Sequence, residues 1–185
     1  NGLPGFVLVG LPEATVKESK DRVRSAIINS GFTFPAKKIT VNLSPADLPK
    51  EGSRFDLPIA IAILAATEQI PMDHLAKYEF LGELALSGEI KSVKGAIPAA
   101  LSSKKNNRTL IISAENQSEI SLIHQNHTLI THNLLELCQY LYNEINLSSV
   151  EYRQYQEENN QLANLQDVIG QEHAKRALEI AAAGG

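Results

Sequence analysis

A run of apolar residues from Ile59 to Ala66 constrains the fold of this chain more than any other stretch. Almost every residue in the run is apolar, and a helix that is apolar on all sides is a buried one. Pro58 suits the first turn of such a helix, because the backbone there needs no N–H, and Asp56 can cap it. The run therefore predicts a central helix in the core of the protein.

A strand and a polar loop precede this helix. Residues 38–43 alternate polar and apolar side chains and include three β-branched residues, which is typical of a half-buried strand. Residues 44–54 contain three residues that break regular structure, Pro45, Pro49 and Gly52. A polar loop held between a strand and a buried helix is a common position for ligand contacts or chemistry.

The rest of the chain alternates irregularly between strand and helix patterns. Apolar stretches predict strands at 6–9, which we expect to be buried, and at 109–112 and 128–131. The turn Ser87-Gly88 predicts a β-hairpin over 79–91. Helical periodicity predicts helices at 13–30 (closed by Gly31), 93–105, 115–123, 133–145 (capped by Asn133) and 172–183. A hairpin within such a series predicts an α+β fold rather than a doubly wound sheet.

Composition divides the chain into three parts. Residues 148–164 are rich in Gln, Glu and Asn and nearly lack apolar side chains, which predicts a linker. Residues 1–147 then form one α+β domain, and 165–185 begin another. Because the sequence opens on Asn1 rather than Met, we expect a piece of a longer protein.

The charge and the cysteine content exclude some classes of protein. The 185 residues carry a formal net charge of −4, which argues against nucleic-acid binding through bulk charge but leaves room for a local basic patch. The single cysteine, Cys138, excludes an internal disulfide and lies in an apolar helical pattern, which favours a buried hydrophobe over a nucleophile. No signal peptide or long apolar span is present, so we expect a cytoplasmic protein without membrane contact.

Few residues are candidates for catalysis or metal binding. Ser53 would need a base within hydrogen-bond reach, and a loop serine beside a glycine is more often a turn residue. His124 and His127 are three residues apart, but no cysteine or carboxylate follows at ligand spacing. We therefore expect no metal site and no catalytic residue.

Basic residues gather near the polar loop and on the first helix. The loop set is Lys37, Lys38, Lys50 and Arg54, and the helix set is Lys17, Lys20, Arg22 and Arg24. On an acidic chain such residues could contact phosphate groups. A solvated face with local salt bridges is the more common explanation of a charge run, and both interpretations remain open.

Several motifs together resemble the N-terminal part of the magnesium-chelatase-like AAA+ ATPases, the ComM/YifB family. They are Gly2-Leu3-Pro4, Val9-Gly10-Leu11-Pro12, Val16-Lys17-Glu18-Ser19, Arg22-Val23-Arg24-Ser25-Ala26, Phe34-Pro35, Val41 to Ser53 and Phe55-Asp56-Leu57-Pro58. Asp167 to Glu172, Ala174 to Ala177 and the final Gly-Gly resemble the segment before the family's Walker A loop. The resemblance covers essentially the whole chain, although the family's first strand is expected to be missing.

The resemblance implies a ribosomal protein S5 domain 2-like fold, shared with the proteolytic domain of Lon and the C-terminal domain of the recombination protein RadA. Lon uses a Ser–Lys dyad. Aligned without gaps, the serine position falls on Arg54 and the lysine position on Ile97, with Lys94 a turn away. The resemblance thus implies a non-proteolytic scaffold.

The resemblance also implies a function for the full-length protein. Members of this family act as hexameric, ATP-driven helicases in branch migration of DNA during natural transformation. We expect ATP and Mg²⁺ in the full-length protein and no cofactor in this piece, which lacks a Walker A loop. Candidate DNA contacts are Lys37, Lys38, Lys50, Arg54, Arg22 and Arg24, and the candidate edge of the nucleotide site is Asp167, Val168, Ile169 and Gly170.

Two alternatives remain at this point. In the first, the domain is a residual peptidase that uses Ser53 and Lys94. In the second, it belongs to a chelatase-like machine that remodels a protein partner rather than DNA.

Overall fold

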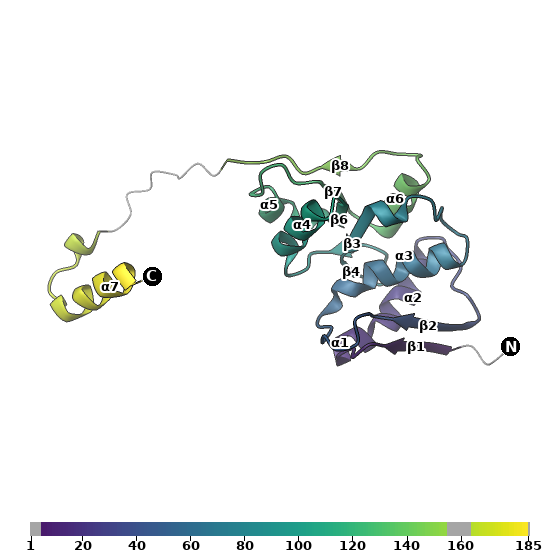
Figure 1. Cartoon of the computed structure of the whole chain (residues 1–185), viewed down its shortest axis with the longest axis horizontal. Coiled ribbons are helices and arrows are strands. Elements are labelled where there is room, and N and C mark those ends of the chain that lie inside the picture. The colour runs from purple at the N-terminus through teal and green to yellow at the C-terminus, as the bar shows by residue number, and fades with distance from the viewer. Residues whose placement is uncertain (1–4, 155–163, 185) are drawn as a thin grey trace. The chain divides into compact units, whose positions relative to one another are not determined.

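The computed structural model describes residues 5–154 and 164–184. The chain forms two compact units, Asn1–Arg153 and Gln154–Gly185 (Figure 1). The predicted linker 148–164 therefore lies partly outside the described residues. Its first residues belong to the first unit, because Ser148 and Ser149 pair with a neighbouring strand and Val150 is buried. The first unit thus extends past the expected boundary at residue 147.

The first unit mixes helices with three small sheets. Its helices are α1 (Ala14–Lys17), α2 (Ser19–Asn29), α3 (Asp56–Ala66), α4 (Ala96–Lys105), α5 (Gln117–Ile120) and α6 (Leu134–Leu141). Its strands are β1 (Gly5–Val9), β2 (Lys38–Asn42), β3 (Tyr78–Leu81), β4 (Glu83–Leu84), β5 (Ile90–Lys91), β6 (Thr109–Ser113), β7 (Thr128–Thr131) and β8 (Ser148–Ser149). This arrangement confirms the mixed α+β class.

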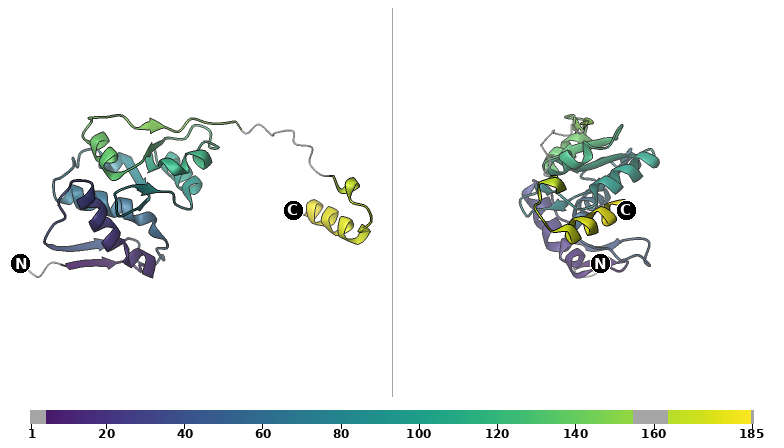
Figure 2. Two further views of the ribbon diagram at one scale, coloured as in Figure 1. Left: turned by 180° about the vertical axis from the view of Figure 1, so that it is seen from behind. Right: turned by 90° about the vertical axis from the view of Figure 1, so that its left-hand side faces the viewer.

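The sheets are joined by both parallel and antiparallel pairings. β1 and β2 run side by side in parallel (Figure 2). The largest sheet has the order β3-β6-β7-β8, in which only the pairing of β7 with β8 is antiparallel. β4 and β5 form an antiparallel hairpin.

Helix α3 is the centre of the larger core, as its apolar sequence predicts. It contacts α2 on one side and β3 and β4 on the other (Figure 1). Seven of its apolar side chains are buried: Leu57, Ile59, Ala60, Ile61, Ile63, Leu64 and Ala65. A second cluster lies between α4, α5, β6 and β7 and includes Val150 from the end of the unit.

Strand β1 is not buried, so the expectation for residues 6–9 is wrong. Phe6 and Leu8 pack on the core, but Val7 and Val9 are each 42% exposed. Among the described residues, β1 pairs only with β2, and one face of this two-stranded ribbon faces the solvent. A short apolar run does not reveal whether both faces of a strand will be covered.

Two other predicted elements are divided. The expected helix 13–30 is interrupted at Glu18, and Gly31 follows its end with a φ of +86°, as the left-handed cap requires. The expected hairpin over 79–91 is confirmed by β4 and β5, but its first strand is shorter than predicted, because residues 79–81 belong to β3, which joins β6 in the largest sheet. Gly82 separates β3 from β4, where an added Cβ would lie 2.7 Å from the Ile90 side chain.

Asn133 caps α6 by accepting a hydrogen bond from the Glu136 N–H at 2.9 Å, which confirms that prediction.

Asp56 does not cap α3, contrary to the prediction. It is the first residue of the helix, and its fully buried carboxylate faces α2 and β4. Arg22 Nε donates to Asp56 Oδ2 at 2.6 Å, and the Ser19 hydroxyl and the Leu84 N–H also donate to this carboxylate. The hydrogen bond to Asp56 raises the pKa of Arg22, against an opposing effect of burial. A buried carboxylate is tolerated when partners satisfy it in this way.

The second unit contains a short turn of 3₁₀ helix at Leu165–Asp167 and the helix α7 (Glu172–Gly184). Helix α7 begins where the sequence predicts it. Across the described residues of both units, no helix combines the length and the apolar character needed to cross a membrane.

Replacement of Asp56 by Asn is expected to destabilise the protein by about 3–5 kcal/mol, because Arg22 would remain partly buried without its charged partner. The free energy of unfolding in urea measures this effect. Asp73→Asn at an exposed position is the matched control and should change stability by no more than about 0.5 kcal/mol. Equal destabilisation of both variants would contradict the proposed role of the Asp56 carboxylate.

Cys138 is expected to resist thiol reagents in the native protein. It is fully buried in α6, and burial raises the pKa of its thiol to about 12. Since a raised pKa favours the protonated thiol, only about one molecule in ten thousand would carry a thiolate near pH 8. Labelling with a chromogenic disulfide should be slow in buffer and fast in concentrated urea. Rapid labelling of the folded chain would show that the thiol is accessible.

Candidate functional site

The loop between β2 and α3 is held by its own lysine. Lys50 is only 6% exposed, and its ammonium donates to the backbone carbonyl oxygens of Leu48, at 2.6 Å, and Pro45. Its backbone also pairs with the segment after β1, where the Glu13 N–H donates to the Lys50 carbonyl at 3.2 Å. These contacts occupy Lys50 within the fold, which differs from the expectation that it meets phosphate.

The end of this loop lines a cavity of about 430 Å³. Ser53 opens the 3₁₀ turn Ser53–Phe55 that leads directly into α3, and Gly52 before it has a φ of +74°. The other walls come from β4 and from the segment before α4. The lining residues are Glu51, Gly52, Ser53, Arg54, Glu83, Ser92, Val93 and Lys94.

Ser53 and Lys94 therefore share one cavity. The Ser53 hydroxyl donates to Glu83 Oε2, and among the described residues no lysine amine is hydrogen-bonded to it. A serine nucleophile depends on a base within hydrogen-bond reach, and a lysine is the base of a Ser–Lys dyad. The geometry instead places a carboxylate beside the hydroxyl. Ile97, where the resemblance places the Lon lysine, lies in the first turn of α4 and is 36% exposed.

Arg54 and Lys94 are the cationic residues of this cavity, whose lining also includes the carboxylates Glu51 and Glu83. Arg54 is half-buried, and its Nε donates to the Glu51 carbonyl at 3.3 Å. Its guanidinium lies against Gly95, where an added Cβ would be 3.4 Å from Nη1. Lys94 is exposed. Because two carboxylates balance the two cations, the cavity carries no net formal charge.

The other predicted DNA contacts are dispersed. Lys37 and Lys38 are exposed at the start of β2, whereas Arg54 follows its far end; a five-residue strand spans about 13 Å. Arg22 is paired with Asp56, and the Arg24 guanidinium lies 5.1 Å from the centre of the Phe34 ring. The structure thus does not gather the six basic residues into one patch.

The predicted edge of the nucleotide site lies in the second unit. The Asp167 carboxylate accepts a hydrogen bond from the Asn164 N–H at 2.9 Å, so it caps the local turn. Val168 is 42% exposed, Ile169 is 98% exposed, and Gly170 has a φ of +72°. These residues form a turn before α7.

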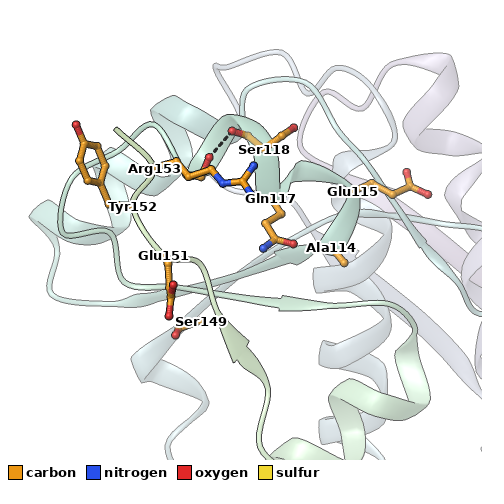
Figure 3. Close-up of a pocket in the computed structure, with 9 residues that line it drawn as sticks. Ala114, Glu115, Gln117, Ser118, Ser149, Glu151, Tyr152 and Arg153 are labelled. Carbon is orange, nitrogen blue, oxygen red and sulfur yellow. Dashed lines mark hydrogen bonds between the residues drawn. The ribbon is translucent and has the colours of Figure 1, made fainter. Parts of the chain in front are cut away.

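The chain from 149 to 153 lines a polar cavity of about 530 Å³ that sequence reasoning missed (Figure 3). Its other wall is α5 and the turn before it. Arg153 extends toward Gln117, while the Tyr152 ring lies apart from these two side chains at the edge of the cavity (Figure 3). The Gln- and Glu-rich composition indicated a linker here. Val150 was the one signal of packing, since it is an isolated apolar residue in a polar stretch and is buried.

The described residues contain no cluster of three or more His, Cys, Asp or Glu side chains that could hold a metal ion. His124 instead packs edge-on against Tyr152, with ring centres 5.1 Å apart.

Comparison with known proteins identifies the family. A family model described as "Subunit ChlI of Mg-chelatase" matches residues 1–116. The competence protein ComM of Haemophilus influenzae is 53% identical over 188 residues, which cover 100% of this chain and 37% of that protein. The protein YifB of Salmonella typhimurium is also 53% identical, over 100% of this chain and 36% of its own length.

A more distant relative is Lon protease 2 of Bacillus subtilis, which is 28% identical over 109 residues, or 58% of this chain and 19% of that protein. The chain spans little more than a third of the length of ComM and YifB. The family model covers more than half of the chain, and the identity to ComM and YifB extends over all of it. This chain therefore belongs to the Mg-chelatase-like ComM/YifB family.

Proposed function

We propose that this chain is the N-terminal part of an ATP-driven AAA+ machine, in which it assists ring assembly and DNA handling during recombination. The observation that carries this proposal is the identity of 53% over the whole chain to a protein named for competence. A hexameric ring, the preferred DNA structure and branch migration belong to the full-length protein and are part of the same proposal.

ATP and Mg²⁺ would bind elsewhere in the full-length protein. The 185 residues contain no glycine-rich phosphate loop of the GxxxxGK[ST] type. The Asp167 carboxylate is occupied as a cap, so the residues present do not form a metal or phosphate site by themselves. We propose only that residues 167–170 border the nucleotide site. When bound, ATP would supply the free energy that drives movement on DNA.

The first unit would act as a scaffold with a non-proteolytic, Lon-like fold of the ribosomal protein S5 domain 2 type. Its family model and its distant similarity to Lon protease 2 support this fold. Among the basic residues, Lys37, Lys38 and Arg54 best suit DNA contact, because the two lysines are exposed and Arg54 borders a cavity. Lys50 and Arg22 are occupied within the fold.

A residual peptidase is the second candidate function. The observation in its favour is that Ser53 and Lys94 line one cavity. The hydrogen bond from Ser53 to Glu83 weighs against it, because the hydroxyl proton points to a carboxylate rather than to the amine. The name of the matching family model also keeps open a chelatase-like role with a protein partner.

The triple variant Lys37→Gln/Lys38→Gln/Arg54→Gln is expected to weaken DNA binding. Each lost phosphate contact removes a counterion-release term, so the slope of log affinity against log salt should fall by about 2 in magnitude. Fluorescence anisotropy with single-stranded and forked DNA over a salt series measures this. The variant Lys77→Gln/Lys175→Gln/Arg176→Gln removes the same charge at positions outside the loop and helix sets and is the control. Equal slopes for the two variants would rule out these contacts.

The chain is expected not to cleave an unfolded protein substrate, and Ser53→Ala should leave this result unchanged. The physical reason is the absence of a hydrogen-bonded amine beside the Ser53 hydroxyl in the described residues. Release of labelled peptides from a denatured protein provides the measurement. Cleavage that disappears in both Ser53→Ala and Lys94→Gln would establish the peptidase in place of the scaffold.

A further inference from the structure

A second basic surface lies at the C-terminal end of α4, away from the residues that the sequence singled out for DNA. We call it the α4-end surface. It includes the exposed side chains of the loop between α5 and β7 and of the segment that follows β8. Its members are Lys104, Lys105, Arg108, His124, His127 and Tyr152.

Backbone and side-chain contacts bring these three segments together. Lys104 Nζ donates to the carbonyl of His124 at 3.1 Å. The Leu110 N–H donates to the carbonyl of His127 at 2.9 Å, which holds the loop beside the start of β6. The Arg153 N–H donates to the carbonyl of Ser121 at 2.8 Å and fixes the last segment against α5.

The charge of this surface contrasts with that of the whole chain. Residues 102–108 and 121–127 contain no carboxylate, although the chain carries a net charge of −4, and the segment after β8 contributes one carboxylate, Glu151, next to Arg153. Arg108 is partly compensated by Glu79, whose Oε1 lies 3.6 Å from Nη1. Lysines near the end of a helix are common, because they interact favourably with its dipole, and this accounts for part of the pattern. The helix dipole does not account for the position of the His124 and Tyr152 rings near these lysines.

The aromatic member is presented to solvent. Tyr152 is 47% exposed, and its ring meets His124 edge-on at 5.1 Å with an interplanar angle of 76°. Tyr152 is also one of the residues that line the cavity beside Arg153, and Figure 3 shows its ring turned away from the Arg153 side chain. The Lys104 ammonium is held at the backbone carbonyl of His124, the residue that supplies one ring of this pair. Aromatic rings among lysines, with few carboxylates, are the usual composition of a surface that binds single-stranded nucleic acid.

We propose that the α4-end surface binds single-stranded DNA, with a base stacked on the exposed ring of Tyr152, which His124 supports edge-on, and the adjoining phosphates on Lys104 and Lys105. This inference rests on the proposed function in DNA handling and adds a contact surface to it. It differs from the loop contacts in its preference: a stacking surface selects unpaired bases, whereas lysines and arginines alone bind duplex and single strands through phosphate.

Fluorescence anisotropy of this chain with a labelled oligothymidine and with a duplex of equal length tests the proposal. Tyr152→Leu should weaken binding of the oligothymidine about tenfold, the range expected for loss of one stacked base, and leave duplex binding unchanged. Lys104→Gln/Lys105→Gln should reduce the salt slope for the single strand by about 1.4. Lys77→Gln/Arg176→Gln makes the same charge change at exposed positions outside every proposed contact and is the control. Urea unfolding midpoints verify that each variant is folded.

The outcomes separate this inference from the proposed function. One outcome is that Tyr152→Leu loses the preference for single strands while the loop variant Lys37→Gln/Lys38→Gln/Arg54→Gln binds DNA as the wild type does. This outcome supports the α4-end surface and contradicts the proposed DNA contacts of the loop. Loss of binding in the loop variant alone overturns the α4-end surface and leaves the proposed function standing. Equal affinity of the wild-type chain for single strands and duplex, or no binding of either, also overturns this inference.

Discussion

The buried carboxylate of Asp56 fixes the relative position of α2, α3 and β4. It sits at the start of the central helix and accepts hydrogen bonds from Ser19, Arg22 and the backbone of Leu84. Taking a carboxylate out of water is costly, so the three elements must meet with their donors in place. The polar loop before α3 is thereby anchored at its end, while buried Lys50 anchors its middle through carbonyl oxygens of the same loop.

This anchoring explains why the cavity around Ser53 has a defined shape. The 3₁₀ turn that carries Ser53 and Arg54 lies directly between Lys50 and Asp56 in the sequence. Glu83, which accepts the Ser53 hydrogen bond, precedes Leu84, which donates to Asp56. The same network therefore orients both walls of the cavity. The loop motif that this chain shares with its family thus has a structural role, because its residues hold the loop in place.

Local patterns predicted the parts of the fold that depend on local interactions. The burial of α3, the Asn133 cap and strand β7 follow from apolar runs, side-chain capping and β-branched residues. The roles of Asp56 and Lys50 could not be predicted, because their partners are chosen by tertiary packing. The Asp56 carboxylate could cap its own helix or join Arg22, 34 residues away, and only the fold decides. The composition of residues 148–153 predicts a linker for a similar reason. The strand β8 pairs through its backbone, and side-chain composition carries no information about that pairing.

Strand β8 has a mechanical consequence. The chain leaves the first unit after Arg153. The last backbone contacts before that point are the short antiparallel pairing of Ser148 and Ser149 with β7, the hydrogen bond from the Val150 N–H to the Thr128 carbonyl and the hydrogen bond from the Arg153 N–H to the Ser121 carbonyl. Tension along the chain would load these few hydrogen bonds before any other part of the sheet. Separation of this segment from β7 and α5 would also separate the Tyr152 ring from the His124 ring. A force on the chain after Arg153 would therefore disrupt this aromatic pair together with β8.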